Sequence, residues 1–181
     1  MTRRPTPLRT RATALGYAIF YRLPQRVRLQ LVRLAAPTYT IGAVTLLRDA
    51  DCDPPGRLLL LRQPPGRGWS LPGGLLGYGE PPADGARREL YEETGIRLAA
   101  HEIAPAVPNA VVHTRGRWVD MVFDAVVSAG AIEPRVDGAE VYEAAWHPVD
   151  NLPKLTLATA RLLAHYSLGP EADGGPSGAA G

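Results

Sequence analysis

The sequence predicts an α/β domain, because segments with strand character and segments with helical period follow one another along the chain. Residues 39–47 are rich in β-branched side chains, and residues 58–61 are four leucines, a pattern typical of a strand buried on both faces. Residues 81–94 and 155–166 instead show the marks of helices. With 181 residues and 45% apolar content, the chain has the size and composition of one ordinary globular domain.

The segment before this domain, residues 1–36, is expected to form a basic helical extension. It contains eight arginines and no acidic residue, so the other 145 residues carry about −6. Two helices are predicted, over 14–23 and 26–36, with Val27, Leu31 and Leu34 of the second on one stripe. The extension is expected to pack on the domain or on a second subunit, as in a homodimer. Contact with an anionic membrane surface and a targeting role are the alternatives.

Several classes of protein are excluded or disfavoured. No apolar run reaches the roughly 18–20 residues needed to span a bilayer, so the chain is not expected to be transmembrane. One cysteine, Cys52, rules out an internal disulfide, and four scattered histidines disfavour a structural zinc site. The acidic body argues against nucleic acid as the main partner. A cytoplasmic location is expected.

The remaining elements follow in order. Strands are predicted over 107–113 and 118–127, joined by a hairpin turn at 114–117, and over 141–146. Residues 49–56 read as a turn rather than a calcium loop, since the full ligand spacing is missing. Residues 169–181 are expected to be a disordered tail, so the domain spans 37–168.

Residues 81–95 carry the chemistry. Pro81 and Pro82 suit the first turn of a helix, and Gly95 suits the position just past its end. Glu89, Glu92 and Glu93 then share one face, at a spacing where like charges repel. A hard divalent cation such as Mg²⁺ or Mn²⁺ would neutralise them. Arg88 can fix a carboxylate. In the glycine loop before the helix, which includes Gly73, an exposed backbone carbonyl can add an oxygen ligand.

The order and spacing of nine positions resemble the Nudix box, G-x5-E-x7-R-E-U-x-E-E-x-G-U, where U is aliphatic. The matching residues are Gly74, Glu80, Arg88, Glu89, Leu90, Glu92, Glu93, Gly95 and Ile96. The approach at 69–74 and the stretch at 146–153 are also similar to the family, so the resemblance covers about Thr38 to Tyr166. It implies a Nudix α/β/α sandwich with a mixed β-sheet. It also implies a Mg²⁺-dependent hydrolase that cleaves a diphosphate linkage in a nucleoside diphosphate joined to a group X, by attack of water at phosphorus.

The resemblance also implies roles for individual residues. Glu92 and Glu93 should be the main metal ligands, with Glu89 a ligand or a base, and the carbonyl of Gly73 should complete a metal shell. Arg88 and Glu80 should orient these groups. Mg²⁺ is the expected cofactor, with Mn²⁺ as a substitute.

Other assignments stay open. The candidates for the general base are Glu89, Glu92, Glu140 and Glu143. Arg62 and Arg67 are candidates for phosphate contacts. Tyr39, Trp69, His113 and Trp118 are aromatic candidates for stacking on a base, with packing favoured for Trp69. The rival functions are a nucleotide-binding regulator without catalysis, a diphosphate isomerase, and a hydrolase of non-nucleotide substrates such as prenyl diphosphates.

Overall fold

The computed structural model describes residues 8–52, 56–113 and 116–169. The chain divides into two compact units, one ending at Tyr39 and the other beginning at Thr40. The first unit contains helices α1 (Leu8–Arg22) and α2 (Gln25–Ala35), which are separated at Pro24. The first of these begins earlier than the helix predicted over 14–23. None of the helices in the described ranges combines the length and apolar character that a membrane span requires.

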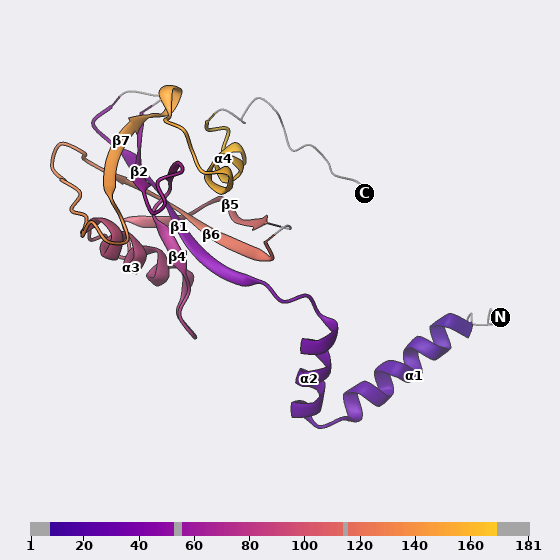
Figure 1. The fold of residues 1–181 in the computed structure, drawn as a ribbon. Coiled ribbons are helices and arrows are strands. Elements are labelled where there is room, and N and C mark those ends of the chain that lie inside the picture. Colours follow the sequence, from indigo (N-terminus) through magenta and orange to yellow (C-terminus); the bar gives the residue numbers. More distant parts are fainter. Residues whose placement is uncertain (1–7, 53–55, 114–115, 170–181) are drawn as a thin grey trace. The chain divides into compact units, whose positions relative to one another are not determined.

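The second unit is built on a mixed sheet of seven strands (Figure 1). Its strands are β1 (Thr40–Asp49), β2 (Arg57–Arg62), β3 (Trp69–Ser70), β4 (Gly73–Leu75), β5 (Ile103–His113), β6 (Trp118–Val127) and β7 (Glu143–Pro148). The main path runs β3-β2-β1-β6-β5, while β4 pairs with β1 and β7 pairs with β2. The β1–β6 pair is parallel, and the other pairs are antiparallel. The predicted mixed α/β architecture is therefore confirmed.

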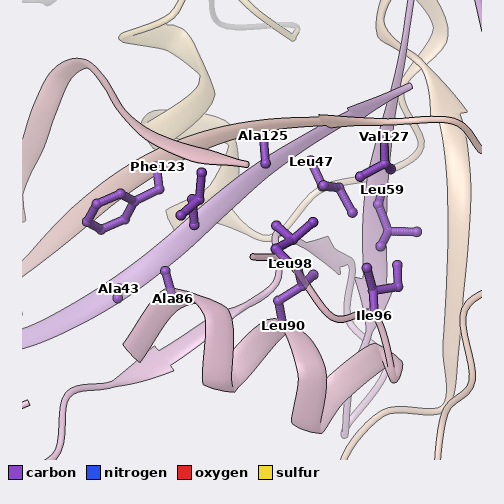
Figure 2. Packing of buried hydrophobic residues seen from close by; sticks show 11 residues of the cluster. Ala43, Leu47, Leu59, Ala86, Leu90, Ile96, Leu98, Phe123, Ala125 and Val127 are labelled. Atoms are coloured by element: carbon purple, nitrogen blue, oxygen red, sulfur yellow. The ribbon is translucent and has the colours of Figure 1, made fainter. Parts of the chain in front are cut away.

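The two α-helices described in this unit contribute to two separate apolar clusters, and a 3-10 helix, Val149–Asn151, follows β7. Helix α3 (Pro82–Thr94) contributes Ala86 and Leu90 to the first, which Figure 2 shows pointing toward the sheet. Helix α4 (Leu157–Ala164) contributes Leu162 and Leu163 to the second. Strand β2 serves both, because successive side chains of a strand point to opposite faces. Leu59 lies in the first cluster, while Leu58 and Leu60 lie in the second, as expected for a strand buried on both faces.

Three predicted elements of the second unit have different bounds in the structure. Strand β5 begins at Ile103 instead of 107, because it continues past an irregularity in its pairing with β6 between Pro105 and Ala110. Strand β7 spans Glu143–Pro148 instead of 141–146, because its ladder with β2 starts where Glu143 faces Arg62. Helix α4 is shorter than the predicted 155–166, and Thr156 caps its first turn. Part of the predicted turn at 114–117, and the predicted tail beyond Gly169, lie outside the described residues.

Asp49, the last residue of β1, links the end of that strand to the start of β2 and to the segment after β6 through hydrogen bonds. Its buried carboxylate accepts hydrogen bonds from the backbone N–H groups of Asp51 and Ala129, each at 3.0 Å. It also accepts one from Arg57 Nε at 2.8 Å. Burial alone would raise the pKa of Asp49, but these hydrogen bonds outweigh it and hold that pKa well below its usual range.

We expect Asp49→Asn to lower the free energy of unfolding at pH 7 by about 2–3 kcal/mol, because hydrogen bonds to a charged group are lost. A carboxyl with a lowered pKa in the folded chain stabilises it above the ordinary value of 3.8, and this stabilisation is lost as the pH falls. The variant should therefore lose less stability than the parent on acidification. Urea unfolding at several pH values measures both effects. Asp124→Asn, which breaks a half-buried pair with Arg48, is the control and should cost about 1 kcal/mol.

Candidate active site

Helix α3 presents a row of carboxylates on the face away from the core. Pro81 precedes the helix and Pro82 starts it, since a missing N–H costs nothing there. Gly95 ends it in the left-handed conformation, at φ 71°, and its N–H bonds to the carbonyl of Tyr91. These signals confirm the helix that the sequence predicts. Burial of Ala86 and Leu90 fixes the helix rotation and turns the carboxylates toward the loop before it.

Arg88 binds three of the carboxylates at once. Its Nε and Nη2 donate to the two oxygens of Glu80, at 2.8 and 2.9 Å. Its Nη1 donates to Glu89 at 2.7 Å and to Glu92 at 2.9 Å, while Nη2 also reaches the carbonyl of Leu75. The hydrogen bonds from Arg88, with one from the Gly77 N–H, lower the pKa of Glu80 to about 2. One guanidinium therefore both orients and partly neutralises this face.

Glu93 is buried and has hydrogen-bond donors of its own. Its Oε1 accepts a hydrogen bond from Gln63 Nε2 at 2.6 Å, and its Oε2 accepts one from the Gly73 N–H at 2.8 Å. Burial raises the pKa of Glu93 to about 7 against the opposing effect of the Gly73 bond, and the charges of Glu89 and Glu140 add to the rise. The carboxyl is thus anchored to the first residue of β4, and its raised pKa favours the protonated form more than in an ordinary glutamate.

Gln63 is a site residue outside the sequence motif. It follows the last residue of β2, receives a 3.2 Å hydrogen bond from the Ser70 hydroxyl, and positions Glu93 from 30 residues away. No spacing or composition signal marks it, because its role depends on the tertiary placement of β2 beside the end of α3.

Gly73 and Gly74 bring the backbone of β4 against its neighbours. A Cβ at Gly73 would collide with the carbonyl oxygen of Ala43 and lie 2.8 Å from Val44 Cα, both backbone atoms. A Cβ at Gly74 would instead collide with the carboxylate of Glu89, which is the free end of a flexible side chain. Gly73 therefore allows β4 to lie close to the backbone of β1, and Gly74 leaves room for the carboxylate of Glu89.

This difference gives a paired prediction. Gly73→Ala is expected to destabilise the fold by several kcal/mol, because backbone must move. Gly74→Ala is expected to leave the melting temperature within a few degrees but to displace Glu89 and lower kcat about 10- to 100-fold. Thermal melts and steady-state kinetics on both variants test this. Equal loss of stability in the two variants would contradict the assignment of Gly74 to the site.

A cavity of about 380 Å³ opens beside the two glycines of β4. Strands β1, β4 and β6 line it, with Thr40, Gly42, Val44, Gly73, Gly74, Leu75, Gly116, Trp118 and Asp120. The charged side chain among these is Asp120, whose Oδ2 lies 2.8 Å from His113 Nε2 and 3.3 Å from Trp118 Nε1. The rings of His113 and Trp118 stack at 4.6 Å. Since Gly73 and Gly74 also adjoin Glu93 and Glu89, strand β4 lies next to both the cavity and the acidic helix face.

The other predicted site residues fall in different places. Arg62 pairs with Glu143 at 2.7 Å across β2 and β7, so each has an opposite charge beside it. Arg67 and Glu140 are exposed on loops, and Tyr39 belongs to the first unit. Trp69 packs in the second apolar cluster, edge-on to His147, in agreement with the packing role favoured for it.

The donor set suits a hard divalent cation. Within residues 8–52, 56–113 and 116–169, no three side chains of His, Cys, Asp or Glu converge as a ready metal cage. Even so, the guanidinium of Arg88 is accompanied by four carboxylates, those of Glu80, Glu89, Glu92 and Glu93. The excess of negative charge and the oxygen chemistry of these groups fit Mg²⁺ or Mn²⁺.

Fold and site together define an α/β/α sandwich enzyme domain with a carboxylate-bearing loop–helix–loop motif. The chain belongs to the Nudix hydrolase family, since the NUDIX domain model matches residues 38–166. The resemblance drawn from the nine motif positions is thereby confirmed.

Relatives and solved structures agree with this membership. A MutT-like protein of Streptomyces ambofaciens is 43% identical over 75 residues, which are 41% of this chain and 46% of the relative. An RNA pyrophosphohydrolase of Bartonella clarridgeiae is 31% identical over 107 residues, covering 50% of this chain and 62% of the relative. The chain thus spans less than two thirds of these curated relatives. The crystal structure of a MutT NUDIX hydrolase from Burkholderia pseudomallei is similar with a TM-score of 0.57 and 29% identity, covering 71% of this chain and 98% of the other.

Proposed function

We propose that this protein is a Mg²⁺-dependent hydrolase that cleaves a diphosphate linkage in a nucleoside diphosphate joined to another group. The observation that carries the proposal is the start of β4, where Gly73 and Gly74 line the cavity and also adjoin Glu93 and Glu89 of the acidic helix. Among the described residues that line the cavity, none is basic and one, Asp120, is acidic, so this part of the lining suits the nucleoside end better than the phosphates. The phosphates then lie toward the carboxylates and their cation.

The metal would be held by Glu89, Glu92 and Glu93, together with the carbonyl of Gly73. A bound Mg²⁺ supplies charge that neutralises the diphosphate and lowers the pKa of a coordinated water toward neutrality. Mn²⁺ belongs in the assays as well, because a bifunctional enzyme from Francisella tularensis, similar in fold at 20% identity with a TM-score of 0.51, is described in complex with AMP and a Mn ion. That likeness covers 76% of this chain and 44% of the other.

Other residues of this chain orient the carboxylates and supply the general base. Arg88 holds Glu89 and Glu92 in fixed directions, and the Gly73 N–H with Gln63 holds Glu93. We assign the general base to Glu140, an exposed carboxylate whose charge acts on Glu93. Its carboxylate would take the proton from the attacking water. Glu143 is less suited because Arg62 already pairs with it.

Glu140→Gln is therefore expected to lower kcat about 10²- to 10⁴-fold with little change in KM, as for loss of a general base. Glu143→Gln is the matched control and should stay within a few-fold of the parent. Steady-state kinetics over a range of pH test this. A large loss of kcat in Glu143→Gln, with near-normal kcat in Glu140→Gln, would instead identify Glu143 of β7 as the general base.

The test of the function itself is a metal-dependent hydrolysis screen. The full chain is assayed in the presence of Mg²⁺ or Mn²⁺ with each of several substrates: nucleoside triphosphates, ADP-ribose, nucleotide sugars, dinucleoside polyphosphates, prenyl diphosphates and RNA with a 5′-triphosphate. The last is included because several relatives are RNA pyrophosphohydrolases. Turnover of a nucleotide substrate that Glu93→Gln lacks supports the proposal. Nucleotide binding without turnover would favour the regulator, and turnover of prenyl diphosphates alone would replace the substrate class.

A further inference from the structure

The first unit of the chain exposes a large amount of apolar surface. We call α1 and α2, residues 8–35, the N-terminal arm. Residues 14–21 contain no charged side chain, and Leu15, Tyr17 and Ile19 are each more than half exposed. On α2, Val27, Leu31 and Leu34 recur along one stripe, and Leu34 is 85% exposed. Among the described side chains of the arm, none is buried.

The arm is also strongly basic. Residues 1–36 carry eight arginines without an acidic residue, so the segment contains no group that could neutralise them. At the corner between the helices, the guanidinium of Arg28 lies 5.7 Å from the ring centre of Tyr21. Arg22, Arg26 and Arg33 are exposed close to the apolar side chains. A partner for this surface has to supply anions and an apolar environment together.

We propose that the N-terminal arm docks on the surface of an anionic lipid bilayer. Lipid phosphates suit the forked guanidinium of arginine, and the acyl boundary takes the leucine, valine and isoleucine side chains. Tyr17 and Tyr21 have the apolar ring and polar tip that suit the headgroup region. Residues 14–21 are too few to span a bilayer, so the arm lies on the surface.

Nucleic acid and a second copy of the arm each satisfy only half of this chemistry. Nucleic acid would neutralise the arginines but leave Leu15, Ile19 and Leu34 in water. A second arm would cover the apolar side chains but bring arginines against arginines without acids between them, which is unfavourable. Each alternative gives a different result in the experiment below.

The experiment is cosedimentation of the full chain with vesicles. One set is made of phosphatidylcholine alone, and the other of equal parts phosphatidylcholine and phosphatidylglycerol. We expect binding to the anionic vesicles, weakened but not abolished by high salt, since screening removes only the electrostatic part. Arg26→Gln with Arg33→Gln should lower the partition coefficient about 30-fold. Leu15→Gln with Leu34→Gln should lower it about tenfold or more.

Matched controls carry the same changes on the other unit. Arg135→Gln with Arg161→Gln, and Leu157→Gln, alter exposed residues outside the arm and should leave binding unchanged. Absence of binding to anionic vesicles overturns the proposal. So does tight binding to single-stranded RNA that the leucine double variant retains in full while vesicle binding is absent. A dimer seen by light scattering, lost in the leucine variant without vesicle binding, would assign the surface to a second copy instead. None of these outcomes depends on hydrolysis.

Discussion

Glu93→Gln is expected to lower kcat about 10²- to 10⁴-fold, which corresponds to several kcal/mol of lost metal-derived stabilisation. The substitution keeps the length of the side chain and removes its charge. It also leaves one of two hydrogen bonds unmade, since an amide can accept from Gln63 or from the Gly73 N–H but its nitrogen accepts from neither. A fall of about 1–3 kcal/mol in the free energy of unfolding should accompany the kinetic loss.

Glu92→Gln separates the two effects. The Glu92 side chain is 55% exposed, so its replacement should lower kcat by a similar factor while the melting temperature stays almost unchanged. Glu102→Gln, at an exposed carboxylate in the turn before β5, is the control for the chemical change alone. Kinetics at saturating Mg²⁺ and thermal melts on all three variants provide the measurements. Near-normal turnover in either Glu92→Gln or Glu93→Gln would show that the assigned residue is not a metal ligand.

Arg88→Lys is expected to lower kcat/KM about 10- to 100-fold and to raise the Mg²⁺ concentration needed for half-maximal rate. Lysine keeps the charge but cannot reproduce the fork that holds both oxygens of Glu80 while reaching Glu89 and Glu92. The carboxylates then have to be ordered by the metal itself. Added Mg²⁺ should therefore raise the melting temperature of this variant more than that of the parent.

Arg87→Lys is the matched control on the same helix. Arg87 donates to the carbonyl of Leu98 and to Asp84, away from the carboxylates that Arg88 binds. Its replacement should lower stability slightly and leave the metal dependence unchanged. If the Mg²⁺ concentration for half-maximal rate rises equally in both variants, the forked guanidinium of Arg88 does not order the site.

The sequence predicted the parts of this molecule that depend on local rules. Pro82 and Gly95 bound the acidic helix, and the period of Ala86 and Leu90 sets which face is buried. Leu58–Leu61 indicated a strand covered on both sides. The roles of Gln63 and Asp120 could not be predicted in this way. Gln63 meets Glu93 only after β2 and α3 pack, and Asp120 lines the cavity only because β6 pairs in parallel with β1.

The pairing of Glu143 with Arg62 has the same origin. Each residue looked available for chemistry when considered alone, as a base or as a phosphate contact. The antiparallel register of β2 and β7 places them opposite each other, where they form an ion pair. Long-range strand pairing, which no local pattern encodes, therefore decides which charged groups remain for the substrate.

The Arg88 clamp has a consequence for the life of the protein in a cell. Because one guanidinium binds Glu80, Glu89 and Glu92 in the folded chain, the acidic face has a counter-ion that belongs to the protein itself. Domains nucleated by a metal unfold when that metal is withdrawn. For the Mg²⁺-dependent hydrolase proposed above, we therefore expect a shortage of magnesium to stop turnover without unfolding the domain, so that activity returns when the ion is restored.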